Sequence, residues 1–121
     1  MVEFALVIPI LCVVLFGVIQ FGILYKNYVT LTDATRVGAR KAATSRHSAT
    51  PKADAEAAVR KSASGIDKPC AGGDGLCVSV TDAWEHGDDV TVTATYPYNV
   101  NLLGFVVASG ALESKTTERV E

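Results

Sequence analysis

Histidine and cysteine are scarce in this chain of 121 residues, which contains two histidines and three cysteines. His47 and His86 lie about 40 residues apart, and neither is near a nucleophile motif, so we expect both to be solvated. A structural zinc site takes four ligands, and the chain has no second cysteine pair beside Cys70 and Cys77. The sequence therefore offers neither a catalytic constellation nor a zinc site, and we expect a protein that is not an enzyme and has no cofactor.

An excess of basic charge is also missing. Eleven Lys and Arg face 13 Asp and Glu, which gives a net charge of −2, and the two signs are interspersed. A nucleic-acid-binding surface needs a basic patch that neutralises phosphates. The glycine-rich AGGDG precedes a predicted strand and not a helix, so it does not fit a phosphate-binding loop. We expect no nucleic-acid partner.

Two side-chain clusters leave alternatives open. The first is an acidic cluster that comprises Asp82, Glu85, Asp88 and Asp89. It could bind calcium, but its spacing does not match an EF-hand, so we expect a solvated acidic turn. The second is an aromatic cluster that comprises Trp84, Tyr96 and Tyr98. It could form a ligand surface, although aromatic residues beside strands in a small fold more often belong to its core or rim.

What the chain does have is a long uncharged stretch near its start. Phe4–Tyr25 reads FALVIPILCVVLFGVIQFGILY, 22 residues without a formal charge and with Gln20 as the one strongly polar side chain. At about 1.5 Å per residue this stretch is roughly 33 Å long as a helix, enough to cross a hydrocarbon core of about 30 Å. We expect Cys12, inside the stretch, to be a small buried apolar residue.

A cleavable secretory signal is the competing interpretation of the stretch. It is disfavoured because the run exceeds an h-region of about 7–15 residues, no basic region precedes it, and no A-x-A-like site follows it. The basic residues after the run would leave the rest of the chain in the cytoplasm by the positive-inside rule. A local disulfide between Cys70 and Cys77 instead indicates an oxidising, external compartment. We expect a basic leader to have been removed, which would resolve this conflict.

Helical periodicity continues beyond the uncharged run. An apolar or small stripe recurs at steps of four and three, with charged residues on the opposite side. The stripe consists of Leu24, Tyr28, Leu31, Thr35, Gly38 and Ala42. We therefore predict one helical domain over residues 1–46, with residues 2–25 in the membrane or a filament core. Small residues in its second half would let another element approach closely.

Residues 47–121, which we call the head, are predicted to form a small α+β domain. Thr50 and Pro51 resemble a helix N-cap and a first-turn proline, and a short helix should end at Gly65. Residues 76–81 and 90–96 alternate apolar and polar side chains around a turn at Gly87, which predicts a β-hairpin. Residues 102–107 are a further apolar piece, and 111–120 could be another strand, for an antiparallel sheet of about three or four strands. The thin core should depend on the disulfide and on the amphipathic half of the long helix.

Glu3 is the charged residue that needs an explanation. A carboxylate at the edge of a long apolar helix is costly to bring into a membrane or filament interior unless a partner neutralises it. The α-amino group of its own or a neighbouring chain and the positive end of the helix dipole are two such partners. A carboxylate that stays wetted at the membrane surface is the alternative.

The opening VEFALVIPILCVVLFGVIQFG and the following LTDATRVGARKAA resemble the TadE-like family of Tad (tight-adherence) type IV pilins and pseudopilins. The resemblance is close over residues 2–43 and loose beyond, where it includes Arg119 and Glu121. It implies a leader removed by a prepilin peptidase, extraction from the inner membrane by an ATPase-driven assembly machine, and polymerisation through the N-terminal helices. Glu3 matches the family's glutamate but is third, not fifth as in mature type IV pilins.

The sequence and the resemblance together predict a structural pilin. It would be held in the inner (cytoplasmic) membrane before assembly and then form a homo-oligomeric extracellular pilus for surface attachment, in contact with the pilus assembly machinery. The main alternative is a single-pass TadE-like accessory protein, either a minor pseudopilin or an assembly factor. A membrane-tethered enzyme or ligand-binding module is a third class and would require a polar pocket in the head. The predicted site residues are Glu3 for charge neutralisation, Cys70 and Cys77 for the disulfide, and for the filament-core helix Phe4, Ala5, Leu6, Val7, Ile8, Pro9, Leu11, Val14, Phe16, Ile19, Phe21 and Leu24.

Overall fold

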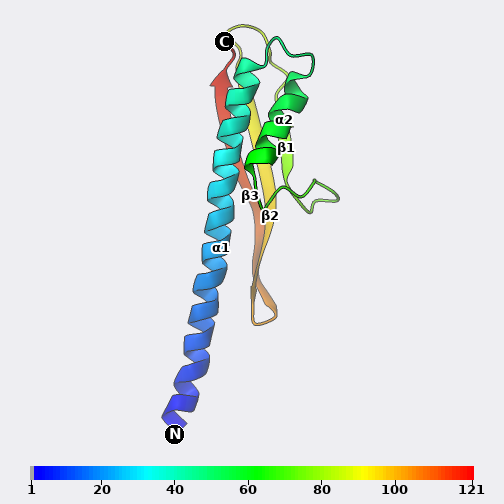
Figure 1. Cartoon of the computed structure of the whole chain (residues 1–121). Helices are drawn as coiled ribbons and strands as arrows, with labels where there is room; N and C mark the ends of the chain where they lie inside the picture. Colours follow the sequence, from blue (N-terminus) through cyan, green and yellow to red (C-terminus); the bar gives the residue numbers. More distant parts are fainter. Residues whose placement is uncertain (1) are drawn as a thin grey trace.

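The computed structural model describes residues 2–121 and has the predicted α+β architecture (Figure 1). Helix α1 covers Val2–Thr44 and continues without a break through Pro9. Helix α2 covers Pro51–Ser62. Strands β1 (Cys77–Val80), β2 (Asp89–Leu102) and β3 (Phe105–Arg119) form an antiparallel sheet in the order β1-β2-β3. The N-terminal end of α1 extends beyond the rest of the molecule, past the tip of the β2–β3 hairpin (Figure 1).

The core lies between the C-terminal half of α1, helix α2 and one face of the sheet. The predicted stripe on α1 is buried from Leu31 onward, whereas Leu24 is half-buried and Tyr28 is exposed, since both lie beyond the main core. On the sheet, the side chains predicted to point inward are buried or half-buried: Leu76, Val78, Val80, Val90, Val92, Ala94 and Tyr96. The period-two pattern of the hairpin is confirmed.

Small residues on α1 let α2 pack closely, as expected. A Cβ atom at Gly38 would lie 2.2 Å from Cγ2 of Val59, which is fully buried on α2. Nonbonded carbon atoms do not approach this closely, so the α1–α2 contact requires a glycine at this position. Ala39 and Ala42 beside it are also fully buried.

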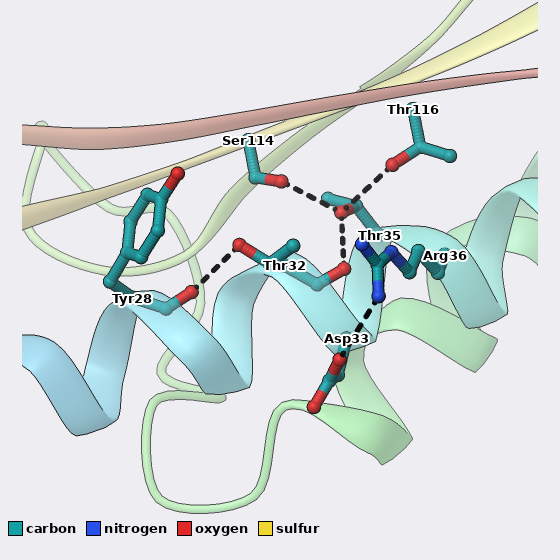
Figure 2. A network of polar contacts seen from close by, with 7 residues as sticks. All are labelled: Tyr28, Thr32, Asp33, Thr35, Arg36, Ser114 and Thr116. Atoms are coloured by element: carbon teal, nitrogen blue, oxygen red, sulfur yellow. Dashed lines mark hydrogen bonds and ion pairs between the residues drawn. The ribbon is translucent and has the colours of Figure 1, made fainter.

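A hydroxyl network joins α1 to β3 (Figure 2). The buried Thr35 hydroxyl lies 2.9 Å from that of Ser114, receives a bond from Thr116 at 3.3 Å and donates to the carbonyl of Thr32 at 2.8 Å. Buried polar groups are costly unless they are paired, and each hydroxyl here has a partner. The network fixes the register of β3 along the helix.

The structure corrects the prediction for the C-terminal third. Residues 102–107 are not a separate apolar piece but the tip of a long β2–β3 hairpin, in which Leu102 pairs with Phe105. The two residues between them, Leu103 and Gly104, have φ values of 50° and 92°. Two consecutive left-handed residues form the kind of tight turn that matches the twist of a hairpin. The predicted strand at 111–120 is therefore the second half of one continuous strand, β3.

The start of α2 is also corrected in detail. Thr50 occupies the N-cap position, but its side chain makes no capping bond. The Ser48 hydroxyl instead accepts a bond from the Thr50 amide at 3.3 Å and donates to the Asp54 carboxylate at 2.5 Å. The helix begins at the predicted proline, while the polar contacts at its start come from the preceding loop and the first turn.

Candidate functional site

The main candidate site is the apolar surface of the rod, the part of α1 before Lys26. Within residues 2–121, α1 is the helix whose length and composition would allow it to cross a membrane. Its most apolar 18-residue window has a mean hydropathy of 2.8, and none of that window is buried. Exposed apolar surface on this scale is characteristic of a lipid or protein contact and not of a solvated surface.

The predicted filament-core residues nearly all lie on this exposed surface. Leu24, next to the head, is half-buried. The exposed ones are Phe4, Ala5, Leu6, Val7, Ile8, Pro9, Leu11, Val14, Phe16, Ile19 and Phe21. They surround the helix on all sides and do not form a single stripe, so the rod can make apolar contacts in every direction.

Cys12 does not have the burial that the sequence suggested. It is a free cysteine, and it is exposed on the rod together with its apolar neighbours. Within a single chain the rod has nothing packed against it that could bury the thiol. Burial of Cys12 therefore requires lipid or another copy of the protein.

Glu3 lies in the first turn of α1 and is exposed. This position is favourable for a carboxylate because the N-terminal end of a helix carries partial positive charge. In the part of the chain that the structure describes, no ion pair includes Glu3; the three pairs present all lie in the head or in the second half of α1. The carboxylate is available to a partner outside the described residues.

The disulfide between Cys70 and Cys77 is present, with Cα atoms 4.9 Å apart. It closes a loop whose last residue before Cys77, Leu76, is fully buried in the core. The Leu76 amide also donates to the Lys68 carbonyl at 2.8 Å. The ring closed by the disulfide therefore holds the loop in a position that places Leu76 in the core, just before β1.

The other clusters form no site in the structure. His47 and His86 are exposed, as are the acidic residues of the turn. Asp82 pairs with Lys52 at 3.4 Å and Asp89 with Arg119 at 3.5 Å. Over residues 2–121, no group of three or more histidine, cysteine or carboxylate side chains could hold a metal ion. Trp84 and Tyr96 are half-buried and pack against the core, as expected for core or rim residues.

One apolar surface was not assigned a role from the sequence. The tip of the β2–β3 hairpin exposes four large apolar side chains, with Phe105 78% accessible. The others are Leu103, Val106 and Val107. The signal was present in the sequence, because Val90–Leu112 is a second uncharged run, of 23 residues. Without the strand pairing, nothing indicated that its centre is an exposed turn.

Comparison with known proteins gives a family match for the N-terminal part of the chain. The family model described as TadE-like protein matches residues 1–40. This match confirms the resemblance carried by the opening VEFALVIPILCVVLFGVIQFG, and it leaves residues 41–121 outside the matched region. No curated protein and no solved structure matches the chain. A TadE-like segment on an exposed apolar helix fits a membrane protein related to the Tad pilus.

Proposed function

We propose that this protein is a structural pilin that is anchored in the inner membrane by the rod and then polymerises through it into an extracellular Tad-type pilus. The observation that carries the proposal is the rod itself: a strongly apolar helix with no part of its most apolar window buried, inside the segment that matches the TadE-like family. The head contributes a disulfide, which suits an oxidising compartment outside the cytoplasm.

The physical basis is that the same surface suits two environments. A helix that is apolar on every side is stable in a bilayer, where all its backbone groups are bonded internally. Lipid tails and leucine side chains are similarly apolar, so transfer from lipid to a helical bundle depends on van der Waals packing. The rod can therefore be stored in the membrane and later packed among copies of itself at modest cost.

The two parts of the chain would have different roles in this mechanism. Residues 1–46 would form the anchoring and polymerising domain, and residues 47–121 a head that needs only to be soluble and stable outside the bundle. Glu3 would be neutralised during assembly by the α-amino group of a neighbouring copy, which would also set the register between subunits. The assembly machinery and a prepilin peptidase would act on the N-terminal segment.

The deciding experiment is electron microscopy and mass spectrometry of material sheared from the surface of cells that express the protein. A pilin should be the dominant component of filaments in that fraction. An accessory TadE-like protein would instead remain in the membrane fraction, with filaments composed of another protein. That second outcome would refute the filament role and favour the accessory role.

A further inference from the structure

Charged, polar and apolar residues form layers across the molecule. Each layer contains residues of two segments that are far apart in the sequence, α1 and the β2–β3 hairpin. On α1 the uncharged run ends at Tyr25, and the β2–β3 hairpin contains a second uncharged run from Val90 to Leu112. A groove between α1 and β2 is lined by Gln20, Ile23, Leu24 and Asn27 on the helix and by Tyr96–Val100 on the strand. On β3 the charge boundary falls between Leu112 and Glu113, which pair with Tyr96 and Thr95, so it lies at the level of the groove and of the boundary on α1. Glu3 lies just before the run on α1, and every other charged residue lies within residues 26–89 or 113–121.

All four tyrosines of the chain lie at this boundary. They are Tyr25, Tyr28, Tyr96 and Tyr98. The ring of Tyr28 points from α1 toward the strands (Figure 2), and Tyr96 and Tyr98 lie on the strand side of the groove. Tyrosine is enriched where a membrane protein passes through the lipid headgroups, because the ring is apolar and the hydroxyl is polar.

The strongly polar uncharged side chains near the groove occupy the same layer. Gln20 and Asn27 lie on the helix, Asn99 on the strand, and Asn101 follows it by two residues. Beyond Asn101 the hairpin contains apolar residues until Ser109. The order of the layers, from charged through tyrosine and amide to apolar, is thus similar on α1 and on the hairpin, where Glu113 of β3 supplies the charged layer opposite Thr95.

The hairpin tip points along α1 toward its N-terminal end (Figure 1). Because Tyr96–Val100 lie opposite the residues from Gln20 to Asn27, the tip beyond them reaches the level of the apolar rod. If the rod spans a bilayer, the head cannot sit above the membrane without its tip meeting the lipid.

We propose that the tip of the β2–β3 hairpin, Leu102–Val107, inserts into the lipid leaflet on the head side and forms a second membrane contact beside α1. This inference rests on the proposed membrane anchoring by the rod. With Asn101 among the headgroups, Leu102 and Leu103 extend about 7 Å further at about 3.3 Å per residue. Surface-bound apolar segments reach a similar depth of about 5–10 Å.

Shallow insertion also agrees with the backbone of the tip. Leu102 pairs with Phe105 and Asn101 with Val106, so the hairpin bonds much of its own backbone at this end. β1 covers the outer edge of β2 only over Val92–Thr95, so the outer edges of the hairpin are open along the arm and at the tip. Open strand edges are not tolerated in the hydrocarbon region, so we expect insertion to stop at the short tip, with the rest of the arm at the level of the headgroups.

The test is fluorescence quenching in phosphatidylethanolamine–phosphatidylglycerol vesicles with brominated acyl chains, using the full chain. Trp84 is the one tryptophan present, and it lies in the charged part of the molecule, so the wild type gives the baseline. Phe105→Trp adds an indole at the tip, and we expect this added emission to be strongly quenched, because an indole inserted among the acyl chains contacts their bromine atoms. Asn99→Trp, placed in the headgroup layer, should be quenched less.

Phe16→Trp, on the rod, distinguishes a failure of the hairpin-tip contact from a failure of membrane anchoring by the rod. Strong quenching at Phe16→Trp but none at Phe105→Trp would overturn the second contact and leave membrane anchoring intact. No quenching at either position would overturn the anchoring itself. An unquenched Phe105→Trp whose emission shifts to the blue as the protein-to-lipid ratio rises would assign the tip to a second copy of the chain, which also overturns the lipid contact.

Discussion

Gly38 is a residue of close contact between α1 and α2. A Cβ atom there would lie 2.2 Å from Cγ2 of Val59, and the β-branched Val59 has little rotamer freedom with which to move away. We expect Gly38→Ala to lower the free energy of unfolding by about 1–3 kcal/mol through overpacking, although alanine is the better helix former. Thermal unfolding in detergent micelles, followed by circular dichroism, measures the change.

Two variants control this prediction. Gly22→Ala adds the same methyl group to α1 at a position where nothing lies within 4 Å, so the melting temperature of the head should not fall. In a Val59→Ala background, the clash is removed and Gly38→Ala should cost much less. A penalty of the same size in both backgrounds would show that the Val59 contact is not its cause.

Thr35 supports a second prediction at the scale of single residues. Thr35→Val keeps the shape of the side chain but leaves the buried Ser114 hydroxyl without its partner at 2.9 Å. An unsatisfied buried hydroxyl costs about 1–3 kcal/mol, and chemical denaturation should show this loss. Thr32→Val is the matched control, because the Thr32 hydroxyl donates to the Tyr28 carbonyl of its own helix and not to β3. Equal effects of the two substitutions would argue against the network.

At the scale of elements, the loop closed by Cys70 and Cys77 should stabilise the head without affecting the rod. We expect Cys70→Ser to lower the free energy of unfolding of the head by roughly 2–3 kcal/mol, because a short loop is no longer constrained in the unfolded chain. Calorimetry should show the lower melting temperature, while membrane insertion stays normal. Cys12→Ser removes an exposed cysteine on α1 and should leave the melting temperature unchanged. An unaltered melting curve for Cys70→Ser would mean that the disulfide does not stabilise the head.

Helix α1 and the first strands could be predicted from sequence because one physical signal dominates in each. The uncharged run and the following stripe have a helical period, and residues 76–80 and 90–96 alternate with a period of two. Strand β3 could not be bounded in this way, because Ala108–Ala111 contains small residues with no clear alternation. Its continuity comes from pairing with β2 over the whole length of the hairpin. Pairing with another strand cannot be read from the local sequence of β3.

At the scale of the whole molecule, the candidate site could be predicted in its composition but not in its geometry. The apolar run showed that residues such as Phe4 and Phe16 require a partner, because no soluble surface exposes so much apolar area. The relation between the rod and the hairpin tip depends on how the sheet lies against α1, and no local pattern encodes that packing. The two uncharged runs, Phe4–Tyr25 and Val90–Leu112, are separated by 64 residues and became one feature only in the folded chain.

Glu3 is the remaining prediction at this scale, since its role concerns the assembled protein. We expect Glu3→Ala to insert into the membrane normally, because the substitution only lowers the cost of placing the helix end near lipid. Assembly should suffer, because a neighbouring α-amino group would lose its partner in an apolar environment, and breaking a buried ion pair costs about 3–5 kcal/mol. The amount of protein in sheared filaments, relative to the membrane fraction, measures both effects.

Glu118→Ala provides the comparison, because it removes the same charge from an exposed position on β3. Its filament yield should match the wild type, which makes a defect in Glu3→Ala specific to the helix end. Glu3→Gln refines the result: an amide can accept a hydrogen bond but cannot neutralise a positive charge, so its yield should stay low if charge pairing is the cause. Normal filaments from both Glu3 variants would remove the ion pair from the mechanism, and assembly would then depend on apolar packing of the rods alone.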